Sequence, residues 1–338
     1  MIMRAIVCEN PGRFETTEKP EPTVESGQVL LQIKAIGICG TDLHAFAGNQ
    51  PYFTYPRILG HELGAEVIGV GEGVHHVFPQ DKVVILPYLS CGQCIACRQG
   101  KTNCCTQINV LGVHTDGGMQ ERIVLPANYV RSVQGLDFQE LAIIEPLAIG
   151  AHAIRRAQIK PGEWVVVVGC GPIGLGIMGQ AQHLGCQVIA VDVEEGRLRH
   201  AREFMGIQHG VLAEDALEAI QAFTSGDLAT AVFDATGHRS ALERGIAYMA
   251  HGGRYILVGL SKEVLSFSHP VIHAKETSLL CSRNATWDDF EQVIDYLKSG
   301  RFPVSGYITN QLPFTEMVDH FADWMDPRAG VIKAMVNL

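Results

Sequence analysis

The pattern of hydrophobic and polar positions changes partway along the chain. Between about residues 150 and 285, short apolar runs alternate with segments of helical periodicity. The apolar runs predict strands over 164–168, 187–192, 230–234 and 254–258. The segments between them predict helices over 172–184, 195–205 and 239–250. This alternation is typical of an α/β fold with a doubly wound parallel sheet.

The first 147 residues show a different pattern. Short strand-like runs, such as 29–36 and 66–70, are separated by many turns. After residue 285, Thr286 is an N-cap candidate for a helix that places Phe290, Val293 and Leu297 on one face. We therefore expect a mostly β domain over 1–147, a parallel-sheet domain over 148–285 and a further segment over 286–338.

Composition and charge exclude several function classes. The 338 residues are 47% hydrophobic and 18% charged, which supports a packed core in about two domains. The formal net charge of −10 and the absence of a basic block disfavour nucleic-acid binding. The first ten residues lack the apolar stretch of a signal peptide. The uncharged run 164–191 is interrupted by glycines, Pro172 and His183, so a buried βαβ unit explains it better than a membrane span.

Four of the ten cysteines are closely spaced. They follow the pattern C-x2-C-x2-C-x7-C in one segment, at Cys91, Cys94, Cys97 and Cys105. Four thiolates in a short loop complete a tetrahedral zinc with no open position, which is a structural site. Disulfides and an iron–sulfur cluster are the alternatives, and the tight spacing disfavours strained disulfides.

A second set of metal-ligating residue types is spread over three segments. Cys39 follows the strand-like run 29–36, Gly60-His61-Glu62 comes some twenty residues later, and Glu145 interrupts an apolar segment. Taken alone, each residue is better interpreted as a buried cysteine, a capping residue or a carboxylate at a helix start. Together, a thiolate, an imidazole and carboxylates form the mixed set that holds a catalytic zinc.

A glycine-rich loop follows the predicted strand 164–168. It reads G-x-G-x-x-G and leads into the predicted helix; we expect it to bind a dinucleotide through Gly169, Gly171, Pro172, Ile173 and Gly174. The next strand ends in Asp192, which would accept hydrogen bonds from ribose hydroxyls and repel a 2′-phosphate, so NAD is favoured over NADP. Arg197, five residues later, is the candidate that would receive such a phosphate.

In their order along the chain, these motifs resemble the zinc-dependent medium-chain dehydrogenases. The matching features are the segment 37–44, Gly-His-Glu, the four cysteines, Glu145-Pro-Leu-Ala and the glycine loop. The resemblance is greatest to the polyol and sugar-acid branch. Segments 49–57, 112–118 and 282–286 resemble the L-galactonate (hexonate) 5-dehydrogenases.

The resemblance implies a GroES-like catalytic domain over 1–147, a Rossmann NAD-binding domain over 148–285 and a return to the catalytic domain over 286–338. It implies two zinc ions per chain: one is structural, and the other is held by Cys39 and His61 with Glu62 and Glu145 exchanging as third ligand. Thr41 and His44 match the family's proton relay. The family is commonly oligomeric, so we expect a homodimer or homotetramer, in which a strand of the cofactor domain crosses the subunit interface. Residues 253–259 and those that follow are the candidates.

A carboxylate-bearing substrate also requires a cation in the site. Arg57 and Arg283 are the candidates, with Asn284 and His114 as polar contacts. An ion pair that stabilises the cleft or the subunit contact is a nearly equal interpretation of each arginine.

The leading expectation is a cytoplasmic enzyme that oxidises a secondary alcohol of a small sugar acid, such as L-galactonate or L-gulonate at C5, with NAD. A sorbitol-type polyol dehydrogenase and an L-threonine dehydrogenase are alternatives on the same residues. A catalytically silent NAD-binding protein is the alternative from another class.

Overall fold

The computed structural model describes residues 2–50 and 53–338, so Pro51 and Tyr52 of the segment 49–57 lie outside the described residues. The chain forms two compact units. The first consists of the residues up to Pro146 together with Thr286–Lys298 and Ile308–Leu338, and the second of Leu147–Ala285 and Ser299–Tyr307. The chain thus passes from the first unit to the second within helix α3 (Phe138–Ala157) and returns at Thr286.

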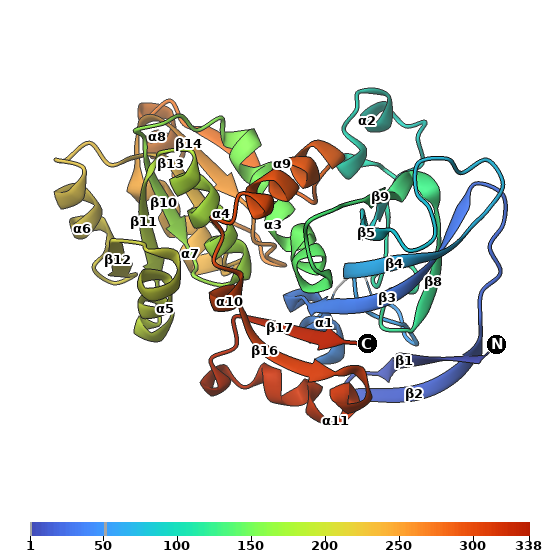
Figure 1. Ribbon diagram of the computed structural model, residues 1–338. Helices are drawn as coiled ribbons and strands as arrows, with labels where there is room; N and C mark the ends of the chain where they lie inside the picture. The colour runs from blue at the N-terminus through green and yellow to red at the C-terminus, as the bar shows by residue number, and fades with distance from the viewer. Residues whose placement is uncertain (1, 51–52) are drawn as a thin grey trace. The chain divides into compact units, whose positions relative to one another are not determined.

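The first unit is built mainly of β-strands (Figure 1). Its seven-stranded sheet has the order β16-β17-β3-β4-β5-β9, with β8 also paired to β3. The strands are β3 (Gln28–Ile38), β4 (Glu62–Val70), β5 (Lys82–Ile85), β8 (Arg122–Pro126), β9 (Val130–Ser132), β16 (Ile308–Pro313) and β17 (Lys333–Asn337). Two smaller antiparallel pairs are formed by β1 (Ile2–Asn10) with β2 (Arg13–Pro20), and by β6 (Tyr88–Leu89) with β7 (Asn109–Val110).

Strand β3 lies at the centre of this sheet, where its alternating apolar side chains are buried in the core. Val29, Leu31 and Ile33 alternate with less buried neighbours and are nearly inaccessible to solvent. β3 pairs with β4, β8 and β17, so the last strand of the chain lies directly beside the segment that leads to Cys39.

Short helices complete the first unit. The α-helices are α1 (Gly40–Phe46), α2 (Ile95–Arg98), the first part of α3, α9 (Trp287–Lys298) and α11 (Met317–His320). The 3₁₀ turns are η1 (Thr102–Cys104), η2 (Ala127–Tyr129), η4 (Phe314–Glu316), η5 (Phe321–Met325) and η6 (Pro327–Ala329).

The second unit contains a six-stranded sheet in the order β12-β11-β10-β13-β14-β15, and every pair in it is parallel. The strands are β10 (Trp164–Val168), β11 (Gln187–Asp192), β12 (His209–Leu212), β13 (Ala229–Asp234), β14 (Met249–Leu257) and β15 (Ser278–Cys281). The helices are α4 (Pro172–His183), α5 (Glu195–Met205), α6 (Ala216–Phe223), α7 (Arg239–Arg244), η3 (Gly245–Tyr248), α8 (His269–Ala274) and α10 (Val304–Tyr307).

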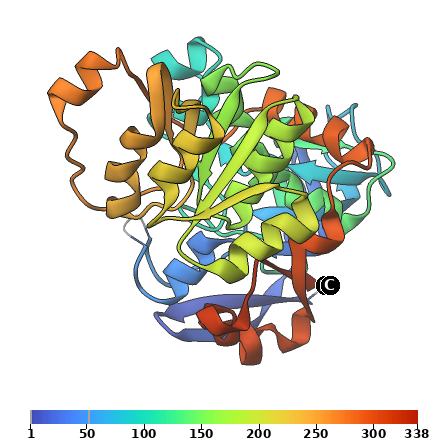
Figure 2. The ribbon, with the colours of Figure 1, turned by 90° about the vertical axis from the view of Figure 1, so that its left-hand side faces the viewer.

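The strand order reverses at β10, which gives this sheet two covered faces (Figure 2). Right-handed crossovers place α4 and α5 on one face, and α7 and α8 on the other. Parallel strands covered on both faces are apolar along their length, as in the buried run Val165–Val168. The fold class expected from the sequence, a mostly β domain and a doubly wound parallel-sheet domain, is confirmed.

The expected helix over 239–250 is shorter in the structure. The α-helix ends at Arg244, continues as the 3₁₀ turn η3 and gives way to β14 at Met249. The Tyr255 hydroxyl donates to the Leu242 carbonyl at 2.7 Å, which occupies an acceptor of the last helical turn. No helix among the described residues is long and apolar enough to cross a membrane.

Candidate zinc and dinucleotide sites

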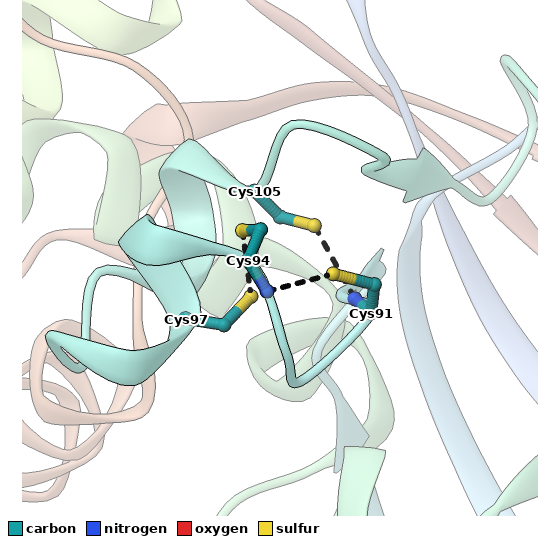
Figure 3. A group of neighbouring side chains, drawn as sticks. All are labelled: Cys91, Cys94, Cys97 and Cys105. Carbon is teal, nitrogen blue, oxygen red and sulfur yellow. Dashed lines mark hydrogen bonds between the residues drawn. The ribbon is translucent and has the colours of Figure 1, made fainter.

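The four closely spaced cysteines converge in the lobe between β6 and β7, which we call the cysteine lobe (residues 90–108; Figure 3). Their four Sγ atoms lie within 4.8 Å of one another. Backbone N–H groups of Cys97 and Thr106 lower the pKa of Cys94 to about 5, which favours its thiolate. All ten cysteines of the chain are free thiols, so disulfides do not explain the lobe. Four sulfur donors in this arrangement fit a closed tetrahedral zinc site.

The second metal-ligating group forms around the first turn of α1 and the start of β4. Cys39 is the N-cap residue of α1, His61 directly precedes β4, and Glu62 is the first residue of β4. One donor atom from each of the three residues lies within 4.8 Å of the other two. His61 Nδ1 is buried and has no hydrogen-bond partner among the described residues. A buried imidazole with an unpaired nitrogen, beside a thiol and a carboxylate, fits a zinc ligand set.

Asp42 links the two segments that carry these residues. Its carboxylate accepts hydrogen bonds from the Cys39 N–H at 2.9 Å and the Gly60 N–H at 3.2 Å. Its Oδ1 also lies 3.8 Å from His61 Nδ1. Burial opposes protonation of His61, but the charges of Asp42 and Cys39 raise its pKa well above the usual value. Asp42 therefore fixes the separation of Cys39 and His61 and favours a basic imidazole.

Glu62 forms a buried ion pair with Lys333 of β17. The ammonium nitrogen lies 2.6 and 2.7 Å from the two carboxylate oxygens of Glu62, and it donates to the Ile38 carbonyl at 3.0 Å. Glu62 is completely buried and Lys333 is 2% exposed. Despite its burial, the pKa of Lys333 is raised by the carboxylate of Glu62, which favours the ammonium form of the lysine. Lys333 is thus the counter-ion of one of the two candidate zinc carboxylates.

Glu145 has a different partner. It lies outside the 4.8 Å group, and its Oε1 accepts a hydrogen bond from the Tyr88 hydroxyl of β6. Burial, together with the charge of Glu62, raises the pKa of Glu145 to about 7. Glu145 precedes Pro146 within α3, and a proline inside a helix removes one backbone hydrogen bond at that turn. The two carboxylates are therefore chemically distinct: one is held by an ammonium group and the other by a phenol.

Glycines pack the backbone that carries His61. A Cβ atom at Gly117 would lie 2.3 Å from the Gly60 carbonyl oxygen, and one at Gly112 would lie 2.7 Å from the Gly60 nitrogen. Asp116, in the same segment, accepts a hydrogen bond from the Ile58 N–H at 3.2 Å. Segment 112–118 thus supports the backbone of the histidine ligand by direct contact.

In the second unit, the glycine loop joins β10 to α4 at the carboxyl edge of the sheet. Gly169 has a φ of +97°, and a Cβ atom at Gly174 would lie 1.8 Å from the Gly169 carbonyl oxygen. Both positions therefore require glycine for the loop to close. A Cβ atom at Gly171 would meet no protein atom within 4 Å, which leaves room beside the N-terminus of α4 for a pyrophosphate.

Asp192 ends β11 beside this loop. Its carboxylate accepts hydrogen bonds from the Cys170 N–H at 2.6 Å and the Glu194 N–H at 3.0 Å. Arg197 lies 3.6 Å from the Glu194 carboxylate. The site lies next to the point where the strand order reverses, which is where dinucleotides bind in folds of this kind.

Comparison with known proteins identifies the family of the chain. Residues 25–135 match the alcohol dehydrogenase GroES-like domain, and residues 172–299 match the zinc-binding dehydrogenase domain. L-galactonate-5-dehydrogenase of Escherichia coli K12 is 40% identical over 99% of both chains. The chain belongs to the zinc-binding alcohol dehydrogenase family.

Two other members of the family are similar over most of their length. L-threonine 3-dehydrogenase of Bacillus subtilis is 33% identical over 90% of both chains. A crystal structure of a short chain alcohol dehydrogenase of E. coli CFT073 with NADH superposes with a TM-score of 0.93 at 32% identity, covering 100% of this chain and 99% of that one. The protein is therefore an oxidoreductase that acts on CH–OH groups, with zinc and a nicotinamide dinucleotide as its cofactors.

The remaining candidate residues of this dehydrogenase lie in different surroundings. On α1, Thr41 is half-buried and His44 is exposed. The Arg57 guanidinium contacts Asp116 at 3.4 Å and Thr54 at 3.1 Å, and His114 Nδ1 accepts a hydrogen bond from the Val110 N–H. In the second unit, Arg283 is exposed and Asn284 has a φ of +52° in the segment after β15.

Sequence reasoning missed three residues that contact the proposed ligands, namely Asp42, Tyr88 and Lys333. Asp42 had a local signal, because an aspartate three residues after an N-cap residue can bond back to its N–H. Tyr88 and Lys333 had none: Lys333 lies 271 positions from Glu62 and reaches it only through the pairing of β17 with β3.

Proposed function

We propose that this dehydrogenase oxidises a secondary alcohol of a sugar acid, with L-galactonate or L-gulonate at C5 as the first candidates, and transfers hydride to NAD. The convergence of Cys39, His61 and Glu62 in one buried group carries the proposal of an alcohol-activating zinc. The similarity to L-galactonate-5-dehydrogenase over the full chain supports the substrate class.

Cys39 and His61 would hold the catalytic zinc, with Glu62 and Glu145 exchanging as third ligand. When bound, zinc supplies a Lewis acid that lowers the pKa of the substrate alcohol. Asp42 keeps the two ligand segments together, and Lys333 neutralises Glu62. Thr41 and His44 move the alcohol proton to solvent, consistent with the exposure of His44 on α1. The second zinc of each chain would be held by the cysteine lobe, through Cys91, Cys94, Cys97 and Cys105.

The cofactor is NAD in preference to NADP. The Asp192 carboxylate at the end of β11 would accept hydrogen bonds from the ribose hydroxyls and repel a 2′-phosphate. Arg197, the residue that would attract such a phosphate, already lies near Glu194. Gly169, Gly171, Pro172, Ile173 and Gly174 would contact the pyrophosphate.

Arg57 and Arg283 are proposed to bind the substrate carboxylate, with His114 and Asn284 as polar contacts. The Arg57 guanidinium contacts Asp116 and Thr54, so mutation of Arg57 would also remove contacts within the first unit.

A homodimer or homotetramer is proposed, with β15 at the subunit contact. β14, which contains most of the run 253–259, pairs with β13 and β15 and has no open edge. β15 is the last strand of the sheet order, and Leu279 on it is 43% exposed. An apolar outer strand is a natural surface for pairing with a second copy. We place the enzyme in the cytoplasm, since ten free thiols suit a reducing compartment.

L-threonine is the second candidate substrate, because the B. subtilis threonine dehydrogenase is 33% identical over 90% of the chain. The test is NAD reduction by the purified protein with L-galactonate, L-gulonate, D-sorbitol and L-threonine, with and without a chelator. Turnover of a hexonate alone, lost on chelation, is expected. Turnover of sorbitol alone would overturn the carboxylate site, turnover of threonine alone would replace the hexonate by an amino acid, and silence with all four would leave only the fold and the cofactor supported.

A further inference from the structure

We propose that the cysteine lobe positions the catalytic zinc site, and that Tyr88 is the residue through which it acts. This inference rests on the proposed function, since it requires a zinc at Cys39 and His61. Tyr88 is a positioning residue, because it contacts a candidate zinc carboxylate and not the reacting atoms.

The first step is the place of Tyr88 at the base of the lobe. β6 consists of Tyr88 and Leu89, and Cys91 follows two residues after its end. β6 pairs with β7, on the other side of the lobe, with Tyr88 opposite Val110 and Leu89 opposite Asn109. The Leu111 N–H also donates to the Pro87 carbonyl at 3.0 Å. The two ends of the lobe are therefore held together at Tyr88.

The second step is the contact of Tyr88 with the catalytic group. Its ring is 3% exposed, and its hydroxyl donates to Glu145 Oε1. This bond uses one carboxylate oxygen and fixes the direction of the other. By contrast, both oxygens of Glu62 are bound to Lys333. The orientation of Glu145 thus depends on a residue of the lobe base, whereas that of Glu62 depends on β17.

The third step is the other exit from the lobe. The chain leaves β7 and enters segment 112–118, whose Gly112 and Gly117 pack against the backbone of Gly60, next to His61. Both ends of the lobe therefore touch the catalytic group: one reaches Glu145, and the other reaches the backbone that carries His61.

These contacts give a cysteine lobe filled with zinc a second role besides stability. Four Cys ligands on one ion fix the path of residues 91–105, and hence the separation of β6 and β7 from which Tyr88 and Gly112 extend. Without that ion, only the β6–β7 pairing and the Leu111–Pro87 hydrogen bond hold the base of the lobe, and the direction of the Tyr88–Glu145 bond is less tightly fixed. Mutation of a residue that hydrogen-bonds to a metal ligand typically lowers metal affinity by about 10–100-fold.

The experiment measures zinc content and the dissociation constant of the catalytic zinc by chelator competition, using the full-length enzyme. The catalytic zinc is identified as the one that Cys39→Ser removes. Tyr88→Phe removes only the hydroxyl and Cys97→Ser removes the lobe zinc. Tyr255→Phe, which removes another buried hydroxyl hydrogen-bonded to the Leu242 carbonyl, is the matched control.

We expect Tyr88→Phe to weaken binding of the catalytic zinc about tenfold while the lobe zinc and the circular dichroism spectrum stay unchanged. Cys97→Ser is expected to weaken it at least as much, and adding Tyr88→Phe to that variant should change it by less than about twofold, since linked residues are not additive. The Tyr255→Phe control is expected to bind both zinc ions as the parent does.

Equal catalytic-zinc affinity in Tyr88→Phe and Tyr255→Phe would overturn the inference, and this holds even where Cys97→Ser does not fold. Full additivity of Tyr88→Phe and Cys97→Ser would overturn it as well. If the Cys39→Ser variant contained as much zinc as the parent enzyme, the proposed catalytic zinc would be overturned instead, so the two failures are distinguishable.

Discussion

Replacing Lys333 by methionine removes the cation from a buried pair and leaves Glu62 charged. All three ammonium contacts are lost, two to Glu62 at 2.6 and 2.7 Å and one to the Ile38 carbonyl at 3.0 Å. Breaking a buried pair by removing one partner costs about 3–5 kcal/mol. In the metal-free protein we therefore expect the first unit to lose about that much stability, because no other ammonium binds Glu62 among the described residues.

Amide hydrogen exchange of β3, β4 and β17 measures this loss without requiring that both units unfold together. The expected fall in protection is about 10²–10⁴-fold, since each 1.4 kcal/mol is about tenfold. Adding Glu62→Gln to Lys333→Met should recover most of it, because the buried charge is then gone.

Lys275→Met is the matched control. Lys275 donates to the carbonyls of Ile246 and Met249 in the second unit, so its loss leaves no buried carboxylate unpaired and should leave the protection of β3, β4 and β17 unchanged. Protection of β3 and β17 within threefold of the parent in Lys333→Met would refute the reasoning.

Three further predictions follow from other parts of the molecule. In the metal-free protein, burial raises the pKa of Glu145 to about 7, and the charges of Asp42 and Cys39 raise the pKa of His61 against the effect of its burial. Both groups must lose protons to bind zinc, so chelator competition should show that affinity for the catalytic zinc falls from pH 8 to pH 6. Equal affinity at the two pH values would contradict this prediction. Gly171→Ala should weaken NAD binding at least about tenfold in a calorimetric titration without loss of stability, because the new Cβ atom meets no protein atom but enters the space proposed for the pyrophosphate. Gly196→Ala is the control: its Cβ atom also meets no protein atom, and NAD binding should be unchanged. Arg283→Ala should raise KM for a hexonate far more than for a neutral polyol in steady-state assays, and equal effects on both would remove the carboxylate contact.

The sequence allowed the elements that carry the sites to be predicted with small errors. The helix over 195–205 and the strand over 187–192 have the predicted bounds, because the hydrophobic periodicity and the residues that mark the ends of each element agree there. The four cysteines of the lobe were predicted to converge, since thiols at such short spacing leave few alternatives. Cys39, His61 and Glu62 were predicted to converge from the combination of their residue types, although Glu145 of that predicted set lies outside the group.

Interactions between distant segments could not be predicted in the same way. Lys333 sits in an apolar strand near the end of the chain, where nothing local marks a lysine as a partner of Glu62. Tyr88 contacts Glu145 because β6 and α3 are brought together by the packing of the first unit. The helix over 239–250 was too long because Tyr255, in the following strand, binds the carbonyl of Leu242. In each case the missing information is tertiary.

The central claim is hydride transfer from a sugar-acid carbon to NAD at the site of Cys39 and His61. The most direct measurement is the mass of the reduced cofactor formed from L-galactonate deuterated at C5, in the parent enzyme and in Cys39→Ser. The account predicts singly deuterated NADH from the parent and none from the variant. Unlabelled NADH from the parent, or labelled NADH at an undiminished rate from Cys39→Ser, would contradict it.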